Sequence, residues 1–134
     1  AFSYLETNVK ENNSSVKPVM ADALKICDTF ADGELDLIVS NPPYIKSADI
    51  ETLQKEVRLE PRLALDGGED GGDFYREIVS RWSRKLKKGG ALAFELGEGQ
   101  ADAVKALMTD KGFSDFKISL DFGGVQRAII GTLL

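Results

Sequence analysis

The chain has 134 residues, and 17 Lys and Arg against 22 Asp and Glu give a formal net charge of −5, with no His. With 43% apolar and 29% charged residues, the composition is that of a globular domain and excludes a disordered or fibrous chain. The lack of His excludes catalytic triads and metal sites that depend on His, and the single Cys27 excludes an intramolecular disulfide. The acidic balance disfavours non-specific nucleic-acid binding, and no apolar run is long enough to span a membrane, so we expect a cytoplasmic protein.

The first part of the chain is predicted to hold a helix and two strands. Apolar residues at spacings of three and four predict an amphipathic helix over the first dozen residues. Val16–Met20 is a short strand candidate, and Pro18 assigns it to an edge or a poorly paired position because proline has no N–H. The pattern of Asp22–Phe30 is ambiguous. Leu35–Ser40 predicts a strand buried on both faces, since four of its six residues are apolar.

The rest of the chain alternates between helices and strands. A short helix near Ser47–Gln54 is followed by a Gly-rich stretch that reads as a functional loop. The later elements are expected to be a helix at Asp73–Lys88 ended by Gly89-Gly90, a strand at Ala91–Leu96, a helix from Ala101 that is closed by Gly112, and strands at Phe116–Leu120 and Arg127–Leu134.

This order of elements predicts an α/β fold. Strands that alternate with helices indicate a mostly parallel sheet with helices on both faces. The last two strands lie close together around Gly123-Gly124 and predict an antiparallel hairpin at the carboxyl end. Ligands of such sheets bind outside the carboxyl ends of the strands, which places the functional residues at Ser40–Tyr44 and Glu95–Glu98.

The tetrapeptide from Asn41 to Tyr44, Asn-Pro-Pro-Tyr, carries the clearest chemistry. The side-chain oxygen of Asn41 and the carbonyl of Pro42 can accept both N–H bonds of a planar NH₂ group and so direct its nitrogen at an electrophile. Two consecutive prolines stiffen the backbone, and the ring of Tyr44 can lie against the bound group. The alternative is a rigid turn with an incidental tyrosine, but its position directly after a strand favours a methyl-acceptor site.

Longer stretches of the sequence resemble one family. Val39–Ile45 (VSNPPYI) resembles the motif of S-adenosylmethionine-dependent enzymes that methylate adenine, guanine or glutamine nitrogens. Glu56–Gly71 (EVRLEPRLALDGGEDG), with the shorter runs DFYR, ELGE and DFGG that follow it, is similar to the release factor glutamine methyltransferases, the HemK/PrmC family. The resemblance covers nearly the whole chain and implies a Rossmann-like class I methyltransferase sheet.

The same resemblance implies a cofactor, a substrate and site residues. The cofactor would be S-adenosyl-L-methionine, held by Asp22, Ala23 and Asn41, with no metal. The substrate would be the glutamine amide of the Gly-Gly-Gln motif in bacterial class 1 peptide-chain release factors. Asn41 and Pro42 would be the catalytic residues, and Pro43 and Tyr44 would complete the substrate site. Neither nucleic acid nor a membrane is implied as a direct partner.

Parts of the family pattern are missing from residues 1–134. Relatives carry an amino-terminal helical domain, a loop of Asp-x-Gly-x-Gly-x-Gly type after the first strand and an acidic residue after the second, and this sequence has none of them. We therefore expect residues 1–134 to be a partial methyltransferase catalytic domain that lacks the first two strands and is inactive alone. Such an incomplete sheet could also pair with a second copy of the chain.

Two other functions stay open. The first is a nucleic-acid amino-methyltransferase, which the acidic balance and the EPRLAL stretch disfavour, and the second is a non-catalytic interaction module that kept only the sheet. The roles of Glu56, Arg58 and Glu60, which would share one face of an extended segment, and of Glu95 are also open. For Glu95, we prefer a structural or substrate-loop contact to catalysis.

Overall fold

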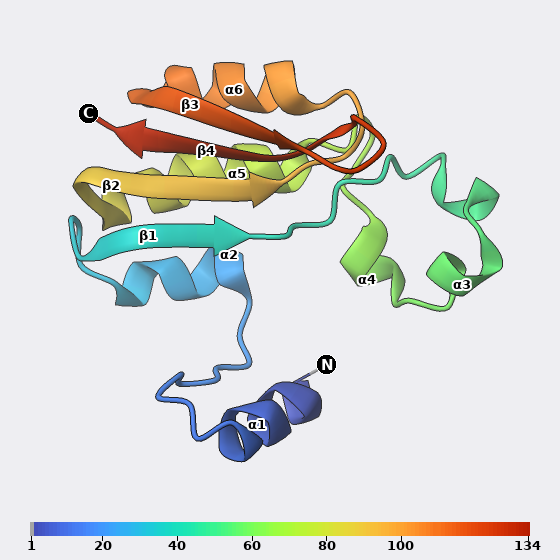
Figure 1. Cartoon of the computed structure of the whole chain (residues 1–134), viewed down its shortest axis with the longest axis horizontal. Helices are drawn as coiled ribbons and strands as arrows, with labels where there is room; N and C mark the ends of the chain where they lie inside the picture. The colour runs from blue at the N-terminus through green and yellow to red at the C-terminus, as the bar shows by residue number, and fades with distance from the viewer. Residues whose placement is uncertain (1) are drawn as a thin grey trace.

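The computed structural model describes residues 2–134, so Ala1 lies outside it. Its strands form one four-stranded sheet in the order β1-β2-β4-β3 (Figure 1). The elements are helices α1 (Phe2–Glu11), α2 (Ala23–Ile26), α3 (Lys55–Arg58), α4 (Arg62–Leu65), α5 (Asp73–Trp82) and α6 (Ala101–Thr109), 3₁₀ turns at Cys27–Thr29, Ile50–Thr52 and Ser83–Lys85, and strands β1 (Leu35–Ser40), β2 (Leu86–Glu95), β3 (Phe113–Leu120) and β4 (Gln126–Leu133).

The strand directions confirm the predicted α/β class. β1 pairs with β2 in parallel, and β4 lies antiparallel to both β2 and β3. Three of the four strands therefore run in one direction, and β3 and β4 form the expected hairpin around Gly123-Gly124. None of the helices among residues 2–134 is long and apolar enough to cross a membrane.

The core lies between one face of the sheet and the helices α5 and α6. Phe94 of β2 meets the ring of Tyr75 edge-on, with 5.3 Å between the ring centroids. Val104 and Met108 of α6 are buried in the same cluster, together with Ile129 of β4. These contacts fix where β2 ends and α6 begins, and both points border the candidate site.

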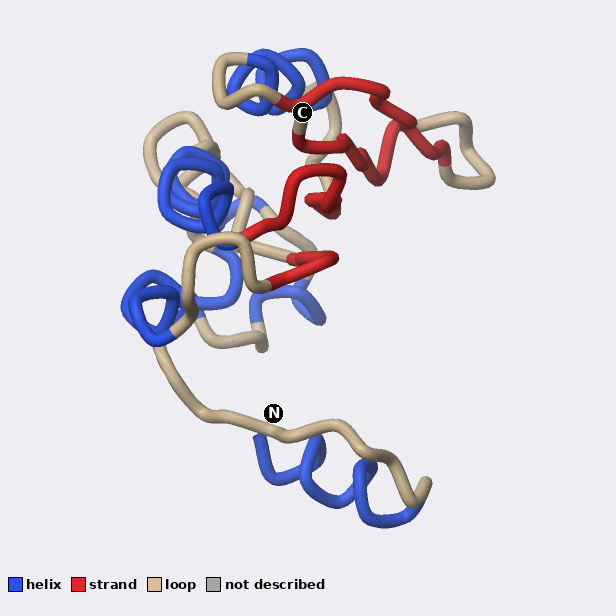
Figure 2. The backbone as a smooth tube through the Cα atoms, turned by 90° about the vertical axis from the view of Figure 1, so that its left-hand side faces the viewer, coloured by secondary structure: helices blue, strands red, loops and turns tan. Residues whose placement is uncertain are grey.

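The other face of the sheet is not covered by a helix in the described part of the chain, which corrects the prediction of helices on both faces. Figure 2 shows α2, α5 and α6 on one side of the strands and α1 set apart from them. Leu37 is 54% exposed and Val39 is 69% exposed, so β1 is not buried on both faces as predicted. An apolar run signals a buried strand only where both layers are present, and here one layer is missing.

Two local predictions were wrong. Val16–Met20 forms no strand; its apolar side chains are exposed, and no neighbouring strand within residues 2–134 pairs with its backbone. The helix expected at Asp73–Lys88 ends at Trp82, and β2 begins at Leu86. Gly89-Gly90 thus lies inside β2, where the pairing register with β1 shifts, and does not end a helix.

The segment between β1 and α5 is also more ordered than predicted. It holds the 3₁₀ turn Ile50–Thr52 in place of a helix over Ser47–Gln54, followed by the short helices α3 and α4. Glu56 and Arg58 lie in α3, so they do not belong to an extended segment as supposed. Figure 1 shows both short helices beyond the carboxyl end of β1, with α3 farther from it than α4.

Candidate functional site

Asn41 follows the last residue of β1 and is exposed at the carboxyl edge of the sheet. It lines three neighbouring cavities of about 430, 740 and 320 Å³. The first lies along the open face of the sheet, the second extends toward Asp22, and the third extends toward Tyr44. The side chain predicted to hold the substrate nitrogen therefore stands where separate binding spaces meet.

The segment after Asn41 is held by backbone hydrogen bonds to residues 65–68. The N–H of Ile45 donates to the carbonyl of Leu65 at 3.0 Å, and the N–H of Gly67 donates to the carbonyl of Ile45 at 2.8 Å. The N–H of Ser47 donates to the carbonyl of Gly68 at 2.9 Å. Pro42 and Pro43 have no N–H to contribute, so this short ladder begins directly after them.

Gly67 explains why the Gly-rich stretch follows the Ala-Leu pair. A Cβ atom at this position would lie 2.7 Å from the Cα of Tyr44 and 2.9 Å from the carbonyl oxygen of Pro43. Both are backbone atoms, so only a residue without a side chain lets the two segments come this close. The loop that reads as functional in the sequence is thus a support for Asn-Pro-Pro-Tyr.

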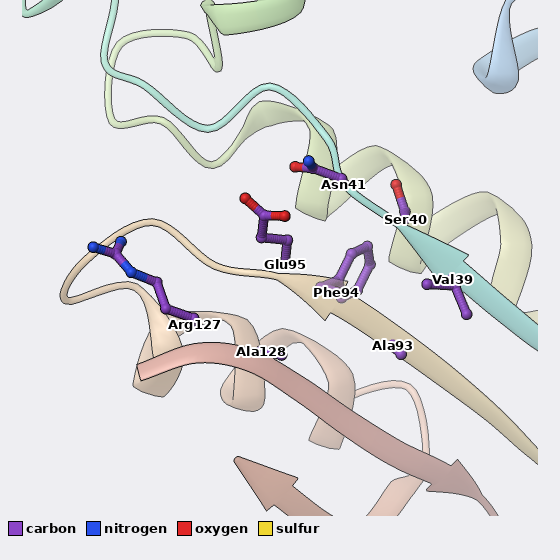
Figure 3. Close-up of a pocket in the computed structure, with 8 residues that line it drawn as sticks. All are labelled: Val39, Ser40, Asn41, Ala93, Phe94, Glu95, Arg127 and Ala128. Atoms are coloured by element: carbon purple, nitrogen blue, oxygen red, sulfur yellow. The ribbon is translucent and has the colours of Figure 1, made fainter. Parts of the chain in front are cut away.

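Tyr44 is fixed at its far end by Glu95, the last residue of β2. The Tyr44 hydroxyl donates to Oε1 of Glu95 at 3.0 Å. Burial and the adjacent Glu95 carboxylate raise the pKa of the Tyr44 phenol. Figure 3 shows the side chains of Asn41 and Glu95 projecting into the space between the ends of β1 and β2. Glu95 thus contacts the Asn-Pro-Pro-Tyr segment through the Tyr44 hydroxyl.

The Tyr44–Glu95 contact leads to a prediction about how the protein depends on pH. Replacing Glu95 with glutamine is expected to lower the pKa of Tyr44 toward its ordinary value, because the carboxylate that accepts its proton is gone. The pKa is higher in the folded than in the unfolded chain, so the contribution of this pair to the free energy of unfolding is complete below about pH 10 and is lost above it.

The measurement is an ultraviolet titration of tyrosinate, with Tyr44→Phe identifying the signal of Tyr44. The same titration of Glu98→Gln serves as the matched control, because Glu98 is exposed and makes no hydrogen bond to Tyr44 in the described structure. A Tyr44 titration that is unchanged by Glu95→Gln would contradict the assigned contact.

On the second side of Asn41, Asp22 caps α2. Its Oδ1 accepts from the N–H of Leu24 at 2.9 Å, and both residues line the 740 Å³ cavity with Asn41. Ala23 is exposed and is not among the residues that line this cavity; its carbonyl accepts from the Trp82 indole N–H at 3.0 Å. The structure brings Asp22 and Asn41 to one cavity and leaves Ala23 beside it.

Two carboxylates of the Gly-rich loop, those of Asp66 and Asp70, are hydrogen-bonded to protein groups. Asp66 accepts from the hydroxyl of Ser47 at 2.5 Å, and Asp70 accepts from both terminal nitrogens of Arg76 at 2.9 Å. These bonds lower the pKa of both carboxyl groups. Within residues 2–134, no cluster of His, Cys, Asp or Glu side chains is arranged to hold a metal ion.

Residues that sequence analysis did not assign to the site also line these cavities. Val57 and Glu60 border the 320 Å³ cavity, Leu63 and Phe74 border the 740 Å³ cavity, and Arg127 borders the 430 Å³ cavity. Val57, Glu60 and Leu63 belong to the EVRLEPRLALDGGEDG stretch, Phe74 belongs to the DFYR run, and Arg127 follows the DFGG run. The similarity of these runs to relatives does not reveal which side chains face a cavity.

Comparison with known proteins decides the family. No protein-family model matches the chain. The chain is 50% identical over 107 residues to the release factor glutamine methyltransferase of Geobacter sulfurreducens. The aligned region covers 79% of this chain and 38% of that protein. It is 35% identical over 131 residues to the enzyme of the same name from Thermodesulfovibrio yellowstonii, covering 97% of this chain and 46% of that protein. The resemblance to the release factor glutamine methyltransferase family is confirmed.

The fold agrees with this family. The crystal structure of a methyltransferase from Pyrococcus furiosus superimposes with a TM-score of 0.69 at 23% sequence identity, covering 98% of this chain and 56% of that one. The chain is thus built like part of a class I methyltransferase. It spans less than half the length of the two family members compared here.

Proposed function

We propose that the complete product of the reading frame containing this chain transfers a methyl group from S-adenosylmethionine to the glutamine amide nitrogen in the Gly-Gly-Gln motif of bacterial class 1 release factors. Residues 1–134 would be the carboxyl-terminal part of its catalytic domain. The observation that carries the proposal is the position of Asn41, which lies where three cavities meet at the end of β1. Family similarity supports the choice of substrate.

The acceptor site is formed by Asn-Pro-Pro-Tyr. The Asn41 side-chain oxygen and the Pro42 carbonyl accept the two N–H bonds of the substrate amide and hold its nitrogen in one direction. Pro43 keeps this backbone extended, and the ring of Tyr44 lies against the planar amide. As the nitrogen gains positive charge, contact with the aromatic ring stabilises it by about 0.5–2 kcal/mol. The methylated nitrogen then loses its proton to water.

The chain provides one side of a cofactor site. The 740 Å³ cavity is lined by Asp22, Leu24 and Phe74 as well as Asn41, and its volume is within the range of small-molecule sites. A carboxylate beside apolar side chains fits the adenine end of S-adenosylmethionine, and Ala23 lies next to it. When bound, this cofactor supplies an electrophilic methyl group on sulfur. No residue of this chain replaces the Gly-rich loop or the ribose-binding carboxylate.

The 134-residue chain is accordingly expected to bind S-adenosylmethionine weakly or not at all and to be inactive alone, because the Gly-rich loop and the ribose-binding carboxylate of the family are not among residues 1–134. Isothermal titration calorimetry of this chain against the cofactor measures this directly, with the complete gene product as the positive control. Micromolar affinity of the 134-residue chain would show that its own residues suffice for binding.

The substrate is tested with labelled S-adenosylmethionine and the complete gene product. Label is expected in a class 1 release factor but not in the same factor with the Gly-Gly-Gln glutamine changed to glutamate, which lacks the amide. DNA and ribosomal RNA are offered in parallel. Label in nucleic acid alone would support an amino-methyltransferase of bases, and label in none of them would support a non-catalytic module.

Release factors are thus the proposed partners, and the reaction is placed in the cytoplasm, where these factors act. We also propose that the isolated chain self-associates through β1. This strand is the end strand of the sheet that residues 2–134 form, and its Leu37 and Val39 side chains are exposed on one face of it. Analytical ultracentrifugation at several concentrations tests this: a monomer at all of them would refute it, and Val39→Lys is expected to weaken any dimer.

A further inference from the structure

The Asn-Pro-Pro-Tyr loop depends on outside groups to hold its backbone. Pro42 and Pro43 have no N–H, and the first peptide group after them that is hydrogen-bonded on both sides in the described structure joins Tyr44 to Ile45. The N–H of this peptide donates to the carbonyl of Leu65 at 3.0 Å. Its carbonyl, on Tyr44, accepts from Nε2 of Gln100 at 3.0 Å.

Gln100 uses both ends of its amide. Nε2 also lies 3.5 Å from the carbonyl of Gly71, and Oε1 accepts from the N–H of Gly97 at 3.0 Å. The Tyr75 hydroxyl shares its one hydrogen between the carbonyl of Glu95, at 2.9 Å, and Oε1 of Gln100, at 3.2 Å. Burial raises the pKa of Tyr75, so its phenol keeps the proton it donates. A single side chain thus joins the Tyr44 peptide to the Gly-rich loop, the turn after β2 and helix α5.

The Gln100 amide lies so close to Gly97 and Gly71 that neither position has room for a side chain. A Cβ atom on Gly97 would lie 2.5 Å from Oε1 of Gln100, and one on Gly71 would lie 2.8 Å from its Nε2 and still closer to the carbonyl oxygen of Tyr44. Gln100 itself is the N-cap residue of α6, and its own carbonyl accepts from the N–H of Val104 at 3.0 Å. The side chain is therefore anchored on a helix whose far end is in the core.

We propose that Gln100 is a positioning residue that sets the orientation of the Tyr44–Ile45 peptide and, through the two stiff prolines before it, the acceptor groups of Asn41 and Pro42. The effect on catalysis rests on the function proposed above, whereas the effect on the loop does not. Gln100 does not line the cavities that Asn41 borders, so it acts through the loop and not on the substrate.

The first test uses the 134-residue chain without cofactor. Gln100→Glu keeps the shape and the acceptor for Gly97 but replaces the donor to Tyr44 with an oxygen that repels its carbonyl. Gln100→Met removes all the bonds without adding charge. Both variants are expected to speed hydrogen exchange of the Ile45 N–H at least about tenfold, which corresponds to about 1.4 kcal/mol. Gln126→Glu makes the same chemical change at an exposed position and is expected to have no effect.

The second test uses the complete gene product. Gln100→Glu is expected to lower kcat for release-factor methylation by roughly 10- to 100-fold, because small misplacements of reacting groups are costly, while KM stays within about threefold. Unchanged Ile45 exchange in both variants, or faster exchange spread evenly over the core, would overturn the positioning role. A wild-type protein that methylates no release factor would refute the proposed function, and the exchange experiment would still decide the role of Gln100.

Discussion

Replacing Asn41 with alanine is expected to lower the rate of release-factor methylation by the complete gene product roughly 10²- to 10³-fold. The substitution removes one of the two fixed acceptors that direct the amide nitrogen, and losing one preorganised polar group of this kind typically has an effect of this size. The Asn41 side chain is exposed and makes no hydrogen bond to another described residue. The free energy of unfolding is therefore expected to change by less than about 0.5 kcal/mol.

The measurement combines steady-state kinetics with thermal unfolding of the same preparation. Asn8→Ala, at an exposed position of α1, is the matched control and should have wild-type kinetics. Asn41→Asp retains one oxygen acceptor, so its rate is expected to lie between those of the wild type and of Asn41→Ala. A near-normal rate for Asn41→Ala would remove Asn41 from the proposed mechanism.

Replacing Gly67 with alanine is expected to disable the site without replacing a residue that contacts the substrate. The new methyl group would meet three backbone atoms within 2.9 Å: the Cα of Tyr44 and the carbonyl oxygens of Gly71 and Pro43. Backbone atoms cannot move aside as a flexible side chain can, so the loop carrying Pro42 must shift. We expect a loss of about 1–3 kcal/mol in stability and a fall in kcat of about 10²-fold.

Gly123→Ala is the control for this prediction. A Cβ atom on Gly123 would meet only a side-chain oxygen of Asp121, at 3.2 Å, in the β3–β4 turn. Thermal unfolding and kinetics of both variants separate a local effect of the Cβ atom from the general effect of exchanging glycine for alanine. Equal behaviour of Gly67→Ala and Gly123→Ala would mean that the close approach at Gly67 does not position the acceptor loop.

Several features could be predicted from the sequence because they depend on local rules. Proline cannot donate a ladder hydrogen bond, so the end of β1 at Ser40 was predicted correctly, and the close spacing of the last two strands predicted their hairpin. The roles of the substrate and cofactor residues stay predictions.

Features that depend on neighbouring layers could not be predicted. The apolar run of β1 was read as a doubly buried strand, yet Leu37 and Val39 are exposed because helices cover one face of the sheet. Gly89-Gly90 was read as the end of a helix, but pairing with β1 draws it into β2. An identical local pattern is compatible with either outcome, and only the tertiary partners distinguish them.

The sequence by itself determined which groups are available for chemistry at the end of β1: an amide oxygen, a carbonyl without a neighbouring N–H, and an aromatic ring. Only the tertiary structure decided what holds them. The partners of Tyr44 are Glu95 and Gln100, which are 51 and 56 positions away along the chain. A hydrogen bond requires atoms to meet within about 3 Å, and no spacing rule brings residues so distant in sequence together. The pairing of β2 with β1, and the packing of α6 on α5, β3 and β4, do so.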